Sequence, residues 1–95
     1  MQFEWDAAKA AANLRKHGVD FEDALRIFAG RILIETDRRR DYGEDRFIAL
    51  GAVEGQVLKV VFTRRGSALR LISAWKAGQR DTATYTESNS ANDPE

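Results

Sequence analysis

Residues 46–80 carry seven basic side chains against one acidic side chain, and these cations are the first candidates for chemistry. They are Arg46, Lys59, Arg64, Arg65, Arg70, Lys76 and Arg80. Arg64 ends one expected strand and Arg70 begins the next, so an antiparallel hairpin should bring the two guanidinium groups together. Such groups repel each other unless an anion lies between them, and their planar shape suits phosphate oxygens. The pattern indicates a site for a backbone phosphate of RNA and for the charge that develops there in phosphoryl transfer.

The same cations have a second interpretation, a solvated surface that is neutralised by acids elsewhere in the chain. Residues 1–45 contain 8 Lys and Arg against 10 Asp and Glu, and residues 81–95 contain none against 4. The whole chain has 15 charges of each sign and no net charge. Because most exposed ion pairs contribute little, the residue pattern alone leaves both interpretations open.

Trp75 and Lys76 end the last expected strand. Strand alternation puts the indole on one side of that strand together with Leu69, Leu71 and Ser73. Trp75 could therefore belong to the core, or it could stack on a base. Lys76 is the best-placed general acid or base or phosphate ligand, although an ordinary exposed lysine would look the same.

His17 and Tyr85 are further candidates with structural alternatives. His17 is the only histidine. Its alternative role is structural, because a protonated imidazole at a helix C-terminus interacts favourably with the helix dipole. Tyr85 lies on the last expected helix, where packing is the alternative. The sequence predicts neither a metal site nor a cofactor. It has one histidine and no cysteine, and its acidic residues do not have the spacing of metal ligands. The sequence contains no nucleophile elbow, Walker A or dinucleotide motif.

Two helices, four strands and a third helix must position these side chains. Asp6 predicts the start of the first helix and Gly18 its end, and Asp20 and Gly30 bound the second. Strands are expected at 31–36, 46–53, 57–63 and 69–75, and a short last helix at about 79–86. The charged segment 37–45 is expected to be a solvated loop.

These elements predict an α+β fold in the order ααββββα, with the two N-terminal helices packed on a four-stranded, mainly antiparallel sheet. A chain of 95 residues, 43% of them apolar, supports one domain. We expect that domain at 1–87 and a polar, disordered tail at 88–95. No apolar run is long enough to cross a membrane and no secretory signal opens the chain, so a cytoplasmic location is expected.

Over residues 3–85 the chain resembles the BrnT toxins of bacterial type II toxin–antitoxin modules. The resemblance is carried by FEWDAAKAAANLRKHGVDFEDALRIF (3–28), EDRFIALG (44–51) and RLISAWKA (70–77), followed by Asp81 and Tyr85. It implies a RelE-like fold and a ribonuclease that works without metal, with the 2′-hydroxyl of the RNA as nucleophile.

Carried over by position, the resemblance implies that Arg64 and Arg70 bind phosphate and stabilise the transition state. Lys76 becomes the leading acid or base, and His17 and Tyr85 become lower-ranked catalytic residues. The residues expected to bind substrate are Arg46, Arg65, Trp75 and Arg80.

The resemblance also implies a protein partner, a BrnA-type antitoxin with a ribbon-helix-helix region. The two chains are expected to form a heterotetramer that contacts operator DNA only through the antitoxin. We expect the antitoxin to cover the cationic face of the sheet, which would exclude RNA from it. No membrane partner is expected.

One departure from the family pattern concerns the last strand, which usually ends I-S-A-R-K-A but here has Trp75 in place of the arginine. Asp81 stands where glutamate is usual, a milder change. If the missing arginine holds phosphate, its loss could slow cleavage on the order of 10²–10³-fold. The chain is then an attenuated toxin, or Trp75 stacks on a base and changes specificity. The alternative function is a catalytically silent binding module that acts with the antitoxin in DNA-bound autorepression.

Overall fold

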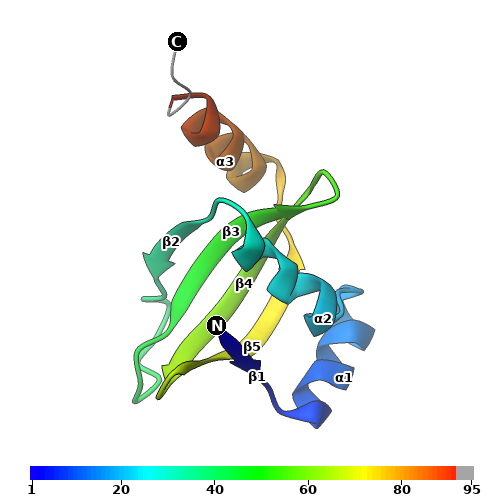
Figure 1. Cartoon of the computed structure of the whole chain (residues 1–95), viewed down its shortest axis with the longest axis vertical. Helices are drawn as coiled ribbons and strands as arrows, with labels where there is room; N and C mark the ends of the chain where they lie inside the picture. Colours follow the sequence, from blue (N-terminus) through cyan, green and yellow to red (C-terminus); the bar gives the residue numbers. More distant parts are fainter. Residues whose placement is uncertain (92–95) are drawn as a thin grey trace.

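A five-stranded mixed sheet forms the centre of the computed structural model, which describes residues 1–91 (Figure 1). Its strand order is β1-β5-β4-β3-β2, and every neighbouring pair is antiparallel except β1 with β5. The strands are β1 (Gln2–Glu4), β2 (Leu33–Thr36), β3 (Phe47–Val53), β4 (Gln56–Arg65) and β5 (Ala68–Lys76). The helices are α1 (Ala7–His17), α2 (Phe21–Ala24) and α3 (Gln79–Ala91), with a 3-10 turn, η1 (Leu25–Ala29), directly after α2. The predicted α+β class is confirmed.

The ends of the first two helices follow from the capping residues in the sequence. The Asp6 side chain accepts hydrogen bonds from the backbone N–H groups of Ala8 and Lys9 at 2.8 and 3.1 Å, which satisfies donors that the first turn leaves unpaired. Gly18 ends α1 with a left-handed φ of 71° and donates its N–H to the Leu14 carbonyl at 2.9 Å. The Asp20 carboxylate caps α2 in the same way as Asp6 caps α1. The first predicted helix is therefore present. The second is α-helical only over Phe21–Ala24 and continues as the 3-10 turn η1, which ends before Gly30.

The expected four-stranded sheet and the order ααββββα are wrong in one respect, because the chain opens with a fifth strand. β1 pairs in parallel with the start of β5, with Gln2 beside Ala68 and Glu4 beside Arg70. A strand of three residues is too short to produce an alternating pattern, and its partner lies far away in the sequence. The four predicted strands are found with their ends shifted by no more than two residues.

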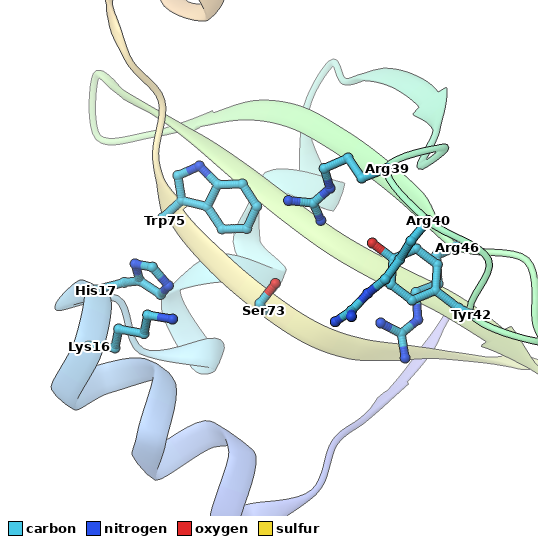
Figure 2. Close-up of a pocket in the computed structure, with 8 residues that line it drawn as sticks. All are labelled: Lys16, His17, Arg39, Arg40, Tyr42, Arg46, Ser73 and Trp75. Atoms are coloured by element: carbon cyan, nitrogen blue, oxygen red, sulfur yellow. The ribbon is translucent and has the colours of Figure 1, made fainter.

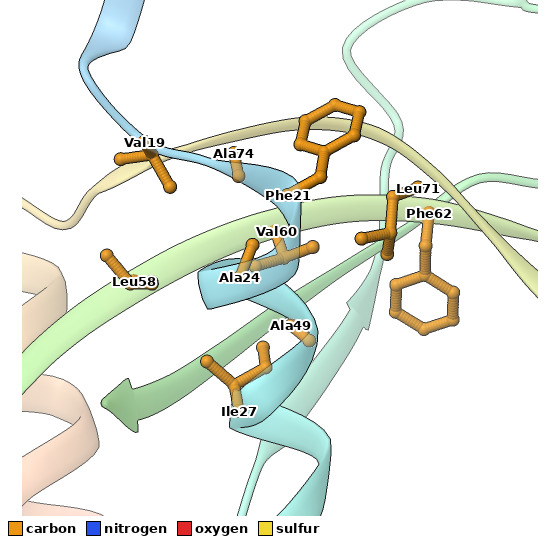
Figure 3. Close-up of a cluster of buried hydrophobic side chains, with 10 residues drawn as sticks. All are labelled: Val19, Phe21, Ala24, Ile27, Ala49, Leu58, Val60, Phe62, Leu71 and Ala74. Atoms are coloured by element: carbon orange, nitrogen blue, oxygen red, sulfur yellow. The ribbon is translucent and has the colours of Figure 1, made fainter. Parts of the chain in front are cut away.

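The core lies between the sheet and the layer formed by α1, α2 and η1, as the sequence predicts. Its buried members are Val19, Phe21, Ala24, Ile27, Ala49, Leu58, Val60, Phe62, Leu71 and Ala74 (Figure 3). The closest approach is between η1 and β3, where a Cβ atom added to Gly51 would lie 2.6 Å from the Ile27 Cβ. The glycine at this position lets Ile27 pack directly on the sheet.

A β-bulge in β5 corrects the expected orientation of its side chains. Val61 pairs with Ser73 but Phe62 pairs with Leu71, so Ile72 is the extra residue. An extra residue reverses the alternation from that point onward. Leu71 therefore stays in the core with Ala74, whereas Ser73 and Trp75 lie on the opposite face of the sheet, turned away from α2, η1 and the core. The expectation that Trp75 shares a face with Leu69 and Leu71 is wrong for this reason.

The last helix, α3, extends away from the sheet (Figure 1). It is attached by a 2.8 Å hydrogen bond from the Tyr85 hydroxyl to the Arg31 carbonyl and by an ion pair of 2.9 Å between Lys59 and Asp81. The helix continues to Ala91, so the predicted tail boundary after residue 87 falls inside it. The rest of the predicted tail, residues 92–95, lies outside the described residues. None of the helices within residues 1–91 has the length and apolar content to span a membrane.

Candidate functional site

A cationic pocket of about 570 Å³ opens on the sheet face opposite the buried core, where the end of α1 meets β5 (Figure 2). Its lining residues, which we call the cationic pocket, are Lys16, His17, Arg39, Arg40, Tyr42, Arg46, Ser73 and Trp75. They come from the end of α1, from the loop 37–46 and its junction with β3, and from β5. Four of the eight are Lys or Arg, and none of the eight is acidic.

The end of α1 is fixed to the sheet by the buried side chain of Asn13. Its carboxamide oxygen accepts the Ala74 N–H at 3.0 Å, and its Nδ2 donates to the carbonyl oxygens of Ala74 at 2.8 Å and Val19 at 3.0 Å. The amide thus supplies the hydrogen bonds that a neighbouring strand would otherwise give to β5. This attachment brings His17 beside Trp75, with the two ring centroids 5.7 Å apart.

The loop 37–46 is anchored by the ion pair between Asp37 and Arg39. The carboxylate of Asp37 is fully buried, and it accepts hydrogen bonds from Nε and Nη2 of Arg39, each at 2.8 Å. These bonds hold the pKa of Asp37 well below its ordinary value, although burial acts in the opposite direction, and they raise the pKa of Arg39. The anchored guanidinium lies with its Cζ 5.6 Å from the centre of the Trp75 ring.

Tyr42 organises the other side of the pocket. The guanidinium carbon of Arg46 lies 4.1 Å from the centre of the Tyr42 ring, and that of Arg40 lies 5.5 Å from it. Cations near an aromatic face are attracted by its quadrupole. Arg46 also donates to Glu44 at 3.1 Å, and the same carboxylate lies 3.6 Å from Arg65.

The pocket keeps an excess of positive charge after its ion pairs are considered. Asp37 and Glu44 partly neutralise Arg39 and Arg46 from outside the lining. Lys16 and Arg40 form no ion pair within the described part of the chain. A partly enclosed group of cations next to two aromatic rings is suited to a polyanion that also carries flat rings.

Three of the residues expected to form the site lie together in this pocket: His17, Arg46 and Trp75. Arg65 lies nearby, because it shares Glu44 with Arg46. For these residues the expected proximity is found, and their functional roles stay predictions.

The expected cluster of Arg64, Arg70 and Lys76 does not form. The two-residue turn after Arg65 sets a register in which Arg64 lies opposite Leu69 and Arg70 lies opposite Thr63, so the two arginines point to opposite faces of the hairpin. Arg70 instead pairs with Glu4 at 2.6 Å.

Lys76 lies on the helix-covered face, because its cross-strand partner is the core residue Leu58. It is therefore on the opposite side of β5 from its neighbour Trp75, and it lines a separate shallow pocket with Asp23 and Glu54.

The two expected site residues on α3 also lie outside the cationic pocket. Arg80 is exposed on the first turn of α3. The hydroxyl of Tyr85 donates a hydrogen bond of 2.8 Å to the Arg31 carbonyl oxygen. The packing alternative for Tyr85 therefore agrees with its position.

Sequence reasoning missed the contribution of the loop 37–46 to this pocket. The segment 37–45, for which the sequence predicts only a solvated loop, contains Arg39, Arg40 and Tyr42. Because residues 1–45 contain more acidic than basic side chains, these arginines do not stand out as a region of positive charge. The signal in the sequence is the run of three arginines at 38–40, followed after Asp41 by the aromatic residue Tyr42. Lys16 and Ser73 had no signal of their own, since Lys16 is one of several cations at a helix end and the bulge reversed the expected side of Ser73.

Among residues 1–91, no group of three or more histidine, aspartate or glutamate side chains is arranged to hold a metal ion. The side chains that line the cationic pocket offer ammonium, guanidinium, imidazole, hydroxyl and aromatic groups.

Comparison with protein families matches residues 5–81 of the 95 to the family described as the ribonuclease toxin BrnT of type II toxin–antitoxin systems. No curated protein matches the chain. The matched segment contains β2 to β5, α1, α2 and the residues that line the cationic pocket. Because the match covers most of the sequence, this chain belongs to the BrnT family of ribonuclease toxins of type II toxin–antitoxin systems.

Proposed function

We propose that this chain is an endoribonuclease that holds RNA in the cationic pocket and cleaves it without a metal ion. The observation that carries the proposal is the convergence of four Lys and Arg side chains and a histidine on a pocket without an acidic lining residue. Such a pocket attracts a polynucleotide through its phosphates. The rings of Tyr42 and Trp75 offer surfaces on which bases could stack.

In the proposed reaction the RNA supplies its own nucleophile, the 2′-hydroxyl. The O2′–P bond forms while the P–O5′ bond breaks. The proton of the 2′-hydroxyl passes to a base on the protein, and an acid delivers a proton to the departing 5′ oxygen. The products are a 2′,3′-cyclic phosphate and a 5′-hydroxyl, and the step balances without water or metal.

The pocket contains groups suited to each part of this reaction. His17 provides an imidazole, the side-chain type that exchanges protons near neutral pH. Arg39, Arg46 and Lys16 would bind the phosphate and stabilise the charge that develops on it. Arg39 is the best oriented of the three, since Asp37 holds it through two hydrogen bonds.

The sequence-based prediction assigned the chemistry chiefly to Lys76, Arg64 and Arg70, with His17 and Tyr85 as lower-ranked catalytic residues. Arg70 lies on the opposite face of the sheet from Arg64 and Lys76, and Arg64 and Lys76 lie at opposite ends of the β4–β5 hairpin. The three residues therefore do not form one site, and we favour the cationic pocket. RNA that passes around the edge of β5 could still reach Lys76, and this competing assignment is included in the test below.

Trp75 determines whether cleavage is fast or slow in this chain. Its ring lies 5.7 Å from that of His17 and 6.0 Å from the ammonium group of Lys59. We propose that the indole takes the place of a further phosphate-binding cation and attenuates the toxin. A ring in this position could instead select a base by stacking.

The experiment is cleavage of a labelled RNA in EDTA by the purified chain and four variants. His17→Ala and Arg39→Ala test the cationic pocket, and Lys76→Ala tests the competing site. Arg15→Ala is the matched control, because Arg15 is an exposed cation on the same last turn of α1 but outside the pocket lining. Thermal unfolding of each variant identifies any loss of fold.

We expect His17→Ala and Arg39→Ala each to lower the cleavage rate by about 10²-fold or more, with Arg15→Ala and Lys76→Ala close to the unmodified chain. Loss of cleavage with Lys76→Ala alone would move the site to the other face of β5. A product with a 3′-hydroxyl instead of a cyclic phosphate would contradict the 2′-hydroxyl mechanism.

The second candidate function is a catalytically silent module that acts with the antitoxin in DNA-bound repression. The observation that favours it is the indole of Trp75, an uncharged ring that lines the pocket near Arg39 and Lys59. It predicts that no variant cleaves RNA, including Trp75→Arg, while the antitoxin still binds. Under either function the proposed partner is a BrnA-type ribbon-helix-helix antitoxin in a heterotetramer, with operator DNA bound only through the antitoxin.

A further inference from the structure

A second hollow, which we call the edge groove, lies on the helix-covered face of the sheet beyond η1. It has a volume of about 300 Å³, and its apolar walls come from η1, β2, β4 and β5. The residues on which the inference depends are Met1, Phe28, Ile34, Phe62, Leu69 and, at the rim, Arg64. None of them lines the cationic pocket, which opens on the other face.

The edge groove is lined by large apolar side chains that are exposed to solvent. Three large apolar side chains are exposed among residues 1–91: Met1 at 86%, Ile34 at 53% and Leu14 at 48%. Two of the three, Met1 and Ile34, belong to this groove. Isolated exposed apolar residues need no explanation, but apolar side chains gathered around a hollow indicate a surface that another molecule covers.

The strand beside the groove is also free to pair. β2 is the last strand of the sheet and pairs only with β3 among the described strands, so the outer edge of Leu33–Thr36 offers unpaired backbone groups. A free strand edge next to apolar side chains is the arrangement by which an extended segment adds to a sheet.

The charge at the rim indicates what the occupant carries. Arg64 is exposed and forms no ion pair within the described residues. Glu44, which lies on the same side of the hairpin end, is already shared by Arg46 and Arg65. A carboxylate on the partner would complete the pairing of Arg64.

We propose that the antitoxin anchors itself in the edge groove with an extended apolar segment that lies along β2 and sets a carboxylate against Arg64. The chain belongs to a family of toxins of toxin–antitoxin systems, so a protein partner must bind some surface of it. This groove combines apolar walls, a free strand edge and an unpaired charge. The anchor lies on the face opposite the cationic pocket. It therefore differs from the sequence expectation that the antitoxin covers the cationic face.

The test is the affinity of full-length cognate antitoxin for the toxin and four variants, measured by calorimetry. Ile34→Lys places a charge in the groove, and Leu14→Lys makes the same change at an exposed apolar residue on α1 outside it. Arg64→Glu reverses the rim charge, and Arg15→Glu is its control on α1. Because Ile34 is half exposed, the variant should fold, and circular dichroism checks this.

We expect Ile34→Lys to weaken binding by about 30-fold or more and Arg64→Glu by about tenfold, with both control variants within about threefold of the unmodified toxin. Hydrogen exchange should give new protection at residues 33–36 in the complex. Equal affinities of Ile34→Lys and Leu14→Lys would overturn the proposal.

Two further results would also overturn it. One is protection confined to residues 37–46 and the end of α1, which would place the antitoxin on the cationic face. The other is a homodimer of the free toxin that Ile34→Lys dissociates, which would make a second copy of this chain the occupant. None of these readouts depends on RNA cleavage, so the proposal and the proposed ribonuclease function can fail separately.

Discussion

Asp37 holds the guanidinium of Arg39 through two hydrogen bonds of 2.8 Å, and the carboxylate that does so is completely buried while the arginine is 55% exposed. A buried acid that points a partly exposed cation into a pocket gives that cation a fixed direction at a cost in desolvation. The pair is therefore best explained by what Arg39 does at the surface, next to Trp75.

Asp37→Asn should leave the chain folded and lower kcat/KM for RNA cleavage by about tenfold, because Arg39 keeps its charge but loses its orientation. The matched control is Asp41→Asn, which removes an exposed carboxylate from the same loop and keeps an acceptor for the Gly43 N–H. Steady-state cleavage assays on both variants check this. Equal activities of the two variants would mean that the ion pair does not orient the arginine for catalysis.

The same pair should make stability depend on pH in the acid range. The pKa of Asp37 is lower in the folded chain than its ordinary value of 3.8, so its contribution is complete above about pH 5 and is lost as the pH falls below that ordinary value. Asp37→Asn should cost about 2 kcal/mol near neutral pH and show a flatter decline as the pH falls from about 5 to about 3. Urea unfolding across this range measures both slopes, and parallel curves for the two proteins would contradict the assignment.

Asn13→Ala should be among the most destabilising single substitutions on α1. It removes three hydrogen bonds and leaves the backbone N–H and C=O of Ala74 without the partner that Asn13 provides, a loss of about 3 kcal/mol. Because Asn13 also fixes the end of α1, we expect RNA binding to weaken in the same variant. Denaturant unfolding and a filter-binding assay provide the two measurements.

The control for Asn13→Ala is Ala12→Ser, a substitution at the preceding residue of α1, which is exposed. It should change the free energy of unfolding by no more than about 0.5 kcal/mol. A loss for Asn13→Ala as small as that of the control would show that water replaces the amide at β5.

Trp75→Arg should increase RNA cleavage by about tenfold or more, because it adds a phosphate-binding cation to the pocket. The same change should lower the thermal midpoint, since Arg39 and Lys59 lose the aromatic ring near which they lie. Trp75→Phe is the control that keeps a ring and adds no charge. Lower cleavage by Trp75→Arg than by Trp75→Phe would indicate that the indole binds substrate.

The sequence predicted the parts of the fold that local chemistry determines. Asp6, Gly18 and Asp20 mark helix ends through hydrogen bonds to nearby backbone, and the long strands follow from their apolar content. β1 could not be found in this way, because three residues carry no period and the pairing that defines the strand is with β5. The bulge at Ile72 depends on packing across the sheet and has no local mark.

The candidate site was predicted only in part for the same reason. His17, Arg46 and Trp75 were chosen for their chemical types, and they do meet in one pocket. Arg64 and Arg70 were placed together from proximity in a hairpin, but the turn register directs them to opposite faces. Arg39 was missed because its importance comes from Asp37, whose burial cannot be deduced from a charged loop.

The side-chain amide of Asn13 has a consequence for the behaviour of the free toxin at high concentration. Without it, the second half of β5, which β1 does not cover, would be an unpaired strand edge to which strands of other copies could add. Asn13 occupies the backbone N–H and C=O of Ala74 within that edge, and the two outer strands of the sheet are very short, β1 with three residues and β2 with four. Short edges are poor templates for fibrous self-association, so a single carboxamide removes part of the edge at which copies of the free toxin could pair.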